Sequence, residues 1–326
     1  MSDTTQDEIT GLNDVSFSDL YLGKENSWLS GVPKTLDPIP APNSCRDDLL
    51  ELRKLCEEVK KVSKRLEFAV THKDISYRVA LLASVSEEVF VLRRFPKTVP
   101  GLEDIRIHKA YVEMLMKPRL SGLIMVAGAF GQGKTTTASA IVASRISKFG
   151  GIAVTIEDPP EMPLQGRRGE GVIYQRWVEQ GEFAQESRQV ARWAPSLIFI
   201  GEVRDPETAT EALRASINGR LVICTIHSDS ARTAVERLYS LANGAAGNSE
   251  DVSNLMASGI AAVVHQKLAG DPKSPVIEFL WLRGDDQEAK GAQNTIRQRR
   301  FTQLDNDIQF QKNQLLKARP VSASSN

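Results

Sequence analysis

Apolar residues at helical spacing mark the N-terminal part of the chain. Between residues 47 and 65 they recur three and four positions apart, which predicts an amphipathic helix. These residues are Leu49, Leu52, Cys56 and Val59. Short apolar runs typical of strands follow at 66–70, 76–82 and 88–93, and looser alternation over 15–32 indicates further strands and a turn. The pattern therefore predicts a small α/β domain over 15–95.

Polar and proline-rich stretches set the expected boundaries of this domain. Residues 1–14 are polar and acidic, and we expect them to form a disordered tail. They are also unlike a secretory signal peptide. The sequence PKTVPG at 96–101 contains prolines and a glycine, which favour an extended connection. We therefore expect an interdomain linker at 96–105.

The rest of the chain alternates apolar runs with helix-forming segments. The expected strands are 122–127, 152–157, 197–201 and 221–226, and the expected helices are 133–148, 206–217 and 230–242. This alternation predicts a domain over 106–285 with a mainly parallel sheet and helices on both faces. After Asn243 we expect helix and then a strand at 276–282. The segment 286–326 is predicted to hold one helix, from about 294 to 316, and a frayed tail.

A glycine-rich loop separates the first of these strands from the first helix. Its sequence GAFGQGKT, from Gly128 to Thr135, fits the phosphate-loop pattern G-x-x-x-x-G-K-[ST]. Glycines let backbone N–H groups close around phosphates at the positive end of the helix dipole. Lys134 is expected to reach the β- and γ-phosphates, and the Thr135 hydroxyl to bind Mg²⁺. The alternative is a purely structural glycine turn. The expected nucleotide-binding residues are Gly128, Gly131, Gln132, Gly133, Lys134, Thr135 and Thr136.

Polar residues also stand at the ends of three other predicted strands. Glu157 ends one strand, Glu202 follows a second and His227 ends a third. Carboxyl ends of parallel strands share one edge of a sheet, so we expect all three around one nucleotide. Glu202 fits a Walker-B acid that reaches Mg²⁺ through water, Glu157 a base that orients water, and His227 a γ-phosphate contact. The alternatives are solvated charges for Glu157 and Asp158 and a structural role for His227. We assign Asp205 to capping the following helix.

Composition and charge narrow the function classes. The formal net charge is zero, and no aromatic-basic pattern is evident, which disfavours a DNA-handling motor. Cys45, Cys56 and Cys224 form no C-x-x-C pair, which argues against a disulfide framework or a zinc ribbon. The longest apolar run, 120–130, is too short to span a bilayer. We therefore expect a soluble protein of a reducing compartment.

Four ordered motifs resemble the secretion ATPase superfamily of type II and type IV secretion and type IV pili, nearest the PilT-type pilus ATPases. The matching segments are GAFGQGKTTT for Walker A, Thr155 to Pro159 for the aspartate box, Gly201 to Thr208 for Walker B and Gly219 to His227 for the histidine box. The resemblance implies a small PAS-like N-terminal domain, a RecA-like ATPase domain, and hydrolysis of ATP with Mg²⁺. It makes Glu157 the catalytic glutamate, Glu202 the Walker-B glutamate and His227 the histidine-box residue.

The resemblance also implies an assembly. In this family, arginines of the N-terminal domain complete the nucleotide site of a neighbouring subunit in a hexameric ring. The matching positions are Arg78 and Arg93, which are outward-facing strand residues in the alternative interpretation. The implied protein is a homohexamer in the cytoplasm, peripheral to the inner membrane through a platform protein of a pilus or secretion machine. Neither membrane insertion nor a nucleic-acid partner is expected.

Some positions depart from the family pattern. Arg220 stands where a second histidine is usual, and Ser196 replaces a common aspartate. Neither change removes a phosphate, metal or base contact, so we expect ATPase activity. The cysteine cluster and the long N-terminal extension of pilus-extension ATPases are absent, and the retraction signature AIRNLIRE is not evident. We expect a pilus motor that drives retraction. The alternatives are a type IVB secretion or conjugation ATPase and a nucleotide-gated scaffold with little turnover.

Overall fold

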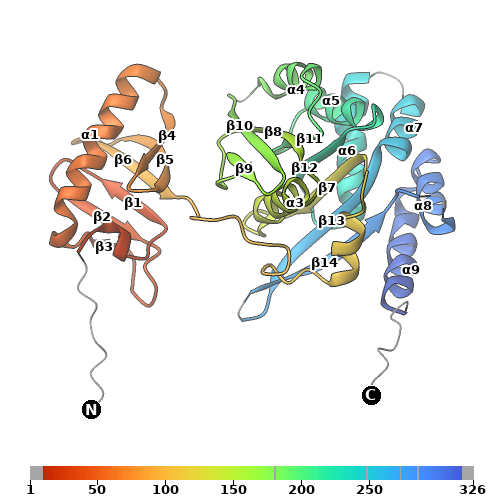
Figure 1. The fold of residues 1–326 in the computed structure, drawn as a ribbon, viewed down its shortest axis with the longest axis horizontal. Coiled ribbons are helices and arrows are strands. Elements are labelled where there is room, and N and C mark those ends of the chain that lie inside the picture. The colour runs from red at the N-terminus through yellow and green to blue at the C-terminus, as the bar shows by residue number, and fades with distance from the viewer. Residues whose placement is uncertain (1–9, 180, 247–248, 272, 285, 318–326) are drawn as a thin grey trace, which may run out of the picture. The chain divides into compact units, whose positions relative to one another are not determined.

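The computed structural model describes residues 10–179, 181–246, 249–271, 273–284 and 286–317. The chain divides into two compact units, Met1–Thr98 and Val99–Asn326, and the predicted linker at 96–105 spans this division. Each unit contains a sheet and helices, drawn as ribbons in Figure 1. The prediction of a small α/β domain followed by a larger one is therefore confirmed for the fold class.

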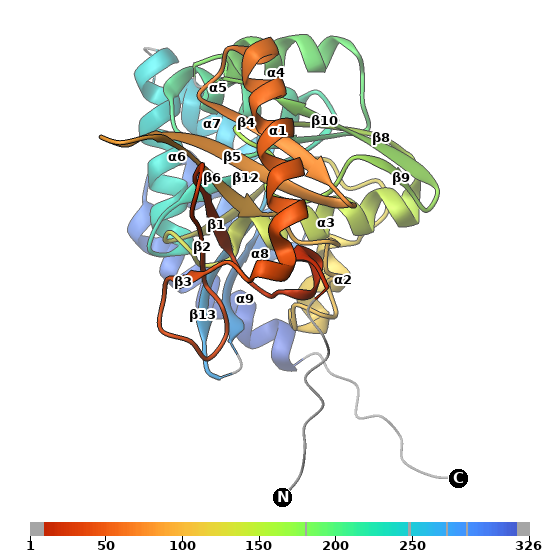
Figure 2. The ribbon, with the colours of Figure 1, turned by 90° about the vertical axis from the view of Figure 1, so that its left-hand side faces the viewer.

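The N-terminal unit is an antiparallel sheet covered by one long helix. The strand order is β3-β2-β1-β6-β5-β4. The strands are β1 (Asp19–Leu22), β2 (Ser27–Ser30), β3 (Ile39–Pro40), β4 (Glu67–His72), β5 (Ile75–Ala83) and β6 (Glu88–Arg94). Burial alternates along β5, because successive side chains of a strand point to opposite faces. The helix α1 (Arg46–Ser63) lies against this sheet (Figure 2). Its residues Leu52 and Cys56 are fully buried.

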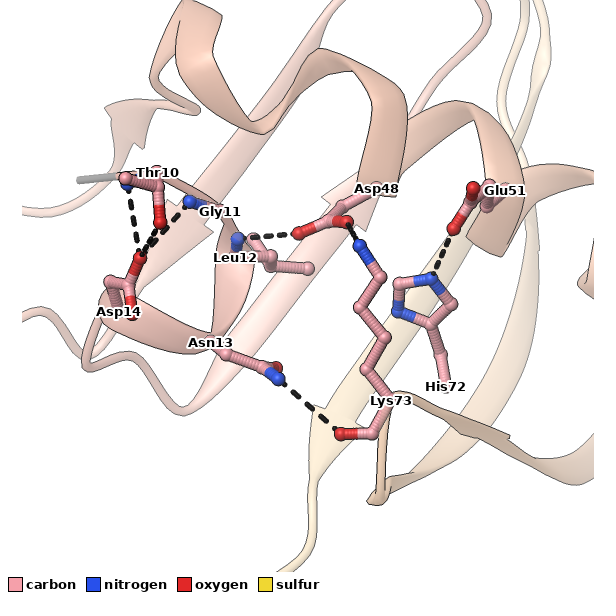
Figure 3. Close-up of polar contacts among 9 residues, drawn as sticks. All are labelled: Thr10, Gly11, Leu12, Asn13, Asp14, Asp48, Glu51, His72 and Lys73. Atoms are coloured by element: carbon pink, nitrogen blue, oxygen red, sulfur yellow. Dashed lines mark hydrogen bonds and ion pairs between the residues drawn. The ribbon is translucent and has the colours of Figure 1, made fainter.

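The start of this unit differs from the expected disordered tail. Residues 1–9 lie outside the described residues, but residues 10–14 fold into the 3-10 turn Leu12–Asp14 and its cap. The Asp14 carboxylate accepts hydrogen bonds from the backbone N–H groups of Thr10 and Gly11, at 3.0 and 3.1 Å (Figure 3). Leu12 is fully buried. This one apolar residue anchors the turn in the core. The sequence did not predict the turn because the neighbouring residues are polar.

A buried carboxylate fastens the same turn to the sheet. Asp48, on α1, accepts hydrogen bonds from the backbone N–H of Leu12 at 2.6 Å and from the Lys73 ammonium (Figure 3). Burial raises the pKa of Asp48, but these two donors outweigh it and hold the pKa below its usual value. Glu51 and His72 pair beside it at 2.8 Å. Because both Asp48 oxygens already accept hydrogen bonds, we interpret Asp48, Glu51, His72 and Lys73 as a cluster that stabilises the fold of this unit.

The larger unit is built on a mostly parallel sheet. The order is β14-β13-β7-β12-β11-β8-β10-β9, with parallel pairing from β13 to β10 and antiparallel strands at both edges. The strands are β7 (Gly122–Gly128), β8 (Gly151–Glu157), β9 (Gly166–Arg168), β10 (Gly171–Trp177), β11 (Leu197–Ile200), β12 (Leu221–His227), β13 (Ile260–Ala269) and β14 (Ser274–Trp281). Every residue of β7 is buried, as expected for a central parallel strand.

Helices cover both faces of this sheet. They are α2 (Lys109–Leu115), α3 (Lys134–Phe149), α4 (Phe183–Arg192), α5 (Pro206–Ile217), α6 (Ala231–Ala246), α7 (Ser249–Gly259), α8 (Gln287–Arg297) and α9 (Leu304–Lys317). Alternate residues of β7 belong to two different cores: Leu123 and Met125 pack with α5 and α6, whereas Ile124 and Val126 pack with α2 and α3. The predicted strands and helices between 122 and 242 are confirmed to within a few residues, except α6, which extends to Ala246.

The predictions for the C-terminal part were only partly right. The helix expected after Asn243 is present as α7, and the strand expected at 276–282 is β14. However, α7 ends at Gly259 and a strand that was not predicted, β13, follows at once. Its run of apolar residues fits a buried strand as well as a buried helix, so periodicity does not separate them. The single helix expected from about 294 to 316 is two helices, broken where Arg299 adopts a φ of 58°. The apolar spacing runs through this break because Ile296, Leu304 and Ile308 pack into one core. Residues 318–326, the predicted frayed tail, lie outside the described residues.

The helices and the cysteines bear on membrane insertion and on thiol chemistry. Across the described ranges, none of the helices combines the length and the apolar character of a membrane span. Cys45, Cys56 and Cys224 are free and buried. Burial raises the pKa of both the Cys56 and the Cys224 thiols to about 12, so neither is a reactive thiolate.

Candidate active site

The phosphate loop joins β7 to α3 at the centre of the larger sheet. Gly131 and Gly133 adopt φ values of 72° and 74°, in the left-handed region that favours glycine. Gly128 is constrained differently, because a Cβ at this position would lie 2.6 Å from the Gln266 carbonyl oxygen. The loop therefore needs glycine at all three positions for backbone reasons.

Lys134 begins α3 and points back over the loop. Its ammonium donates a hydrogen bond to the Ala129 carbonyl at 2.9 Å. Partial burial lowers the pKa of Lys134, and the Glu202 carboxylate acts against this by stabilising the charged form. Glu202 is thus close enough to Lys134 to favour its charged form.

The register of the sheet brings the four motif segments to one edge. His227 is paired with Gly128 across β12 and β7, so the histidine box ends directly beside the phosphate loop. The Ser228 N–H then donates to the Gly128 carbonyl at 3.4 Å. On the other side, a Cβ on Gly201 would lie 3.3 Å from the Glu157 Cγ, so the ends of β11 and β8 are in contact. This is the strand-end crevice in which parallel sheets bind ligands.

Glu157 is almost completely buried at the end of β8, with 2% of its surface exposed. Burial raises the pKa of its carboxyl group to about 7. The Gln175 amide donates a hydrogen bond to Glu157 Oε1 at 3.0 Å, which opposes this effect. Gln175 also donates to the Met162 carbonyl, so its amide is held from two sides. A fixed carboxylate that titrates near neutral pH has the properties of a general base.

Glu202 is half-buried just after β11 and is paired with a cation. Its Oε2 lies 2.6 Å from Arg204 Nη2, and this contact raises the pKa of Arg204. The Thr135 hydroxyl and the Glu202 carboxylate offer oxygen donors, the ligand type that Mg²⁺ prefers. These residues fit a Mg²⁺ site, in which the ion would neutralise phosphate charge. Asp205 instead caps α5, accepting a hydrogen bond from the Thr208 N–H at 2.7 Å, as its sequence context predicted.

Arg78 and Arg93 lie in the N-terminal unit, on neighbouring strands. They face each other as register partners of β5 and β6. Each forms an ion pair within that unit: Arg78 with Glu67 at 2.7 Å, and Arg93 with Asp19 at 2.8 Å. The two arginines are therefore cross-strand neighbours, and a carboxylate balances the charge of each.

Several residues at the site were not predicted from the sequence to have a role there. Gln175 lies on β10 and Gln266 on β13, and neither strand was predicted. Arg204 was included in the Walker-B segment without a role of its own, although it pairs with Glu202. The signal that could have found Arg204 is its spacing, since it follows Glu202 by two residues at a strand end. No comparable sequence signal marked the glutamines.

Comparison with known proteins identifies the class. A family model described as "Type II/IV secretion system protein" matches residues 50–305, and the chain belongs to this family. A twitching motility protein of Neisseria gonorrhoeae is 31% identical over 225 residues, covering 67% of this chain and 57% of that protein. The type IV pilus assembly ATPase PilB of Thermus thermophilus is 33% identical over 171 residues, covering 51% of this chain and 19% of PilB. The predicted superfamily is confirmed.

Solved structures agree on the fold. The pilus retraction motor PilT with bound ADP superposes with a TM-score of 0.73 at 22% identity, covering 91% of this chain and 87% of PilT. The ATPase DotB of Legionella pneumophila gives 0.70 at 20% identity, with coverage of 93% and 89%. The fold is therefore that of ATPases with a small N-terminal domain and a RecA-like domain. The chain spans 57% or less of the length of the curated relatives described above.

Proposed function

We propose that this protein is an ATPase that couples ATP hydrolysis to mechanical work in a type IV pilus machine. The observation that carries the proposal is the shared sheet edge, where the phosphate loop, Glu157, Glu202 and His227 meet. A nucleotide-binding turn alone needs no buried base. Glu157, whose pKa burial raises to about 7, is suited to activating a water molecule there.

Each residue takes one role in this reaction. Loop N–H groups and Lys134 hold the β- and γ-phosphates, and Thr135 and Glu202 hold Mg²⁺, the latter through water. Glu157, fixed by Gln175, orients and deprotonates the attacking water. His227, which lies beside Gly128, contacts the γ-phosphate and loses this contact when the phosphate leaves. Magnesium supplies charge neutralisation when bound, and the protein supplies position and the base.

The machine and its direction are inferred from relatives. Similarity to a gonococcal twitching motility protein supports a motor of motility. We infer retraction as its direction from the resemblance of the motifs to PilT-type ATPases. The family motifs support a homohexamer in the cytoplasm, docked on an inner-membrane platform protein. In such a ring, Arg78 and Arg93 act on the nucleotide of the neighbouring subunit and link its hydrolysis to domain movement.

Steady-state ATP hydrolysis by the purified protein tests the proposal. We expect Mg²⁺-dependent turnover that falls by at least about 100-fold in Glu202→Gln, because metal-bound charge stabilisation is lost. The matched control is Glu113→Gln, an exposed acid of α2 outside the four motif segments, which keeps wild-type turnover. Tight ATP binding by the wild type without turnover would instead support a nucleotide-gated scaffold.

A further inference from the structure

The hairpin of β13 and β14 contacts the phosphate loop through one residue of that loop. Gln132 stands between Gly131 and Gly133, and its side-chain Oε1 accepts a hydrogen bond from the Leu268 N–H at 2.7 Å. The Gln266 side-chain amide donates in return to the Gln132 carbonyl. Gln132 is thus held by its side chain and by its main chain, both from the same strand.

The second contact sets the orientation of a peptide group. In a trans peptide the C=O and the following N–H point in opposite directions. With the Gln132 carbonyl held toward the hairpin, the Gly133 N–H points to the other side of the loop. Gly133 itself leaves no room on the hairpin side, because a Cβ there would lie 3.2 Å from Gln266 Nε2. A phosphate loop works by aiming such N–H groups inward at phosphate oxygens.

The strand that carries Gln266 is rigidly placed. Gln266 is 1% exposed and pairs with Ile277 of β14, while the preceding His265 pairs with Ala127 of β7. Within the described residues, the Gln266 Oε1 has no hydrogen-bond partner. A buried acceptor without a partner is unfavourable for folding. We therefore infer that this glutamine side chain serves mainly as a donor, through the hydrogen bond from its amide to the Gln132 carbonyl.

The same hairpin also contacts the segment that follows the histidine box. Glu278, on β14, accepts a hydrogen bond from the N–H of Ala231 at 2.9 Å, at the first residue of α6. Glu278 Oε2 also lies 3.3 Å from His265 Nδ1. The hairpin therefore holds the phosphate loop through Gln266 and the turn after His227 through Glu278.

We propose that Gln132 and Gln266 are positioning residues for nucleotide binding, which turn the Gly133 N–H toward the β-phosphate before the nucleotide arrives. Neither side chain needs to touch the nucleotide for this role. The inference deepens the proposed function and rests on its assignment of the phosphate loop as the nucleotide site.

Equilibrium titration with a fluorescent ADP in the presence of Mg²⁺ tests this role, together with kcat and KM for ATP and the melting temperature without nucleotide. For Gln266→Leu we expect about tenfold weaker ADP binding and a similar rise in KM, the loss of one well-aimed hydrogen bond. For Gln132→Met, which keeps the main-chain contact, we expect about threefold weaker binding. Turnover at saturating ATP falls less than the affinity does in both variants.

Gln311→Leu is the matched control. Gln311 is also buried, and it exchanges two hydrogen bonds with the backbone of Trp281, outside the site. We expect Gln311→Leu to lower the melting temperature while ADP binds as in the wild type. Wild-type ADP affinity in Gln266→Leu would overturn the proposal, as would equal losses in Gln266→Leu and Gln311→Leu. If Gln266→Leu does not fold, wild-type affinity in Gln132→Met overturns it.

Lys134→Ala in the same titration separates this inference from the proposed function. If Lys134→Ala binds ADP as tightly as the wild type, the nucleotide site itself is assigned wrongly. If Lys134→Ala loses binding and Gln266→Leu does not, only the positioning role fails.

Discussion

His227 is the register partner of Gly128, so the last residue of β12 lies beside the first glycine of the phosphate loop. The Ser228 N–H donates to the Gly128 carbonyl and continues this contact past the strand end. The two segments are therefore joined through the backbone. We propose that the His227 side chain senses whether a γ-phosphate occupies the loop.

This relationship predicts the effect of His227→Ala. We expect kcat for ATP to fall by about 100-fold, because one polar contact to the transferred phosphate is lost. ADP affinity stays within about twofold of the wild type, because ADP lacks that phosphate. Substantially weaker ADP binding in titrations of this variant would mean that His227 supports the loop rather than the γ-phosphate.

Glu157→Gln tests the base. The carboxyl group must be ionised to accept a proton, and burial raises its pKa to about 7. We therefore expect wild-type turnover to rise with pH through about 7 and to level off above it. Glu157→Gln retains ADP binding and loses at least about 100-fold in turnover at all pH values. A wild-type rate that does not change between pH 6 and pH 8 would contradict the assignment.

The same carboxyl group predicts a pH-dependent stability difference. The pKa of this carboxyl group is about 7 in the folded state, above its usual value of 4.5, so folding favours the protonated form. The free energy of unfolding therefore decreases as the pH rises from 4.5 through 7. The glutamine variant does not titrate there. Its free energy of unfolding, relative to the wild type, should therefore increase by about 2.5 kcal/mol between pH 5 and pH 8. Urea titrations of both proteins at the two pH values measure this, and a constant difference would show that Glu157 is solvated.

The in-trans role of the arginines predicts complementation. A subunit with Arg78→Ala and Arg93→Ala keeps its phosphate loop, and a Lys134→Ala subunit keeps its arginines. Each protein alone should hydrolyse ATP poorly, and mixed rings should recover part of the wild-type rate, since some interfaces then combine both halves. Arg46→Ala, an exposed arginine of α1, serves as control. Full activity of the double arginine variant alone would contradict an in-trans role.

Local signals were enough to predict which strand ends lie together. The phosphate loop, Glu157, Glu202 and His227 each stand at the end of an apolar run, and parallel strands place their carboxyl ends together. The rule depends on strand direction, which the alternation of strands and helices already indicates. The structure places these motif segments along one edge, as predicted.

The supporting residues could not be predicted in the same way. Gln175 and Gln266 act through strands that join the sheet from distant parts of the sequence. One strand lies in a segment that had no clear pattern, and the other resembles a buried helix in its apolar content. Contacts such as Gln266 with Gln132 arise from tertiary packing, which a single sequence does not encode locally.

The most direct test of the central claim, that the protein is an ATPase that works as a ring, compares ATP hydrolysis with the oligomeric mass. ATP hydrolysis and light-scattering mass are recorded on the same samples over a range of protein concentrations, for the wild type and for Glu202→Gln. The account predicts that specific activity rises as rings form, and that Glu202→Gln assembles equally well but does not turn over. A stable monomer that binds ATP without hydrolysing it, or a Glu202→Gln protein as active as the wild type, would contradict the account.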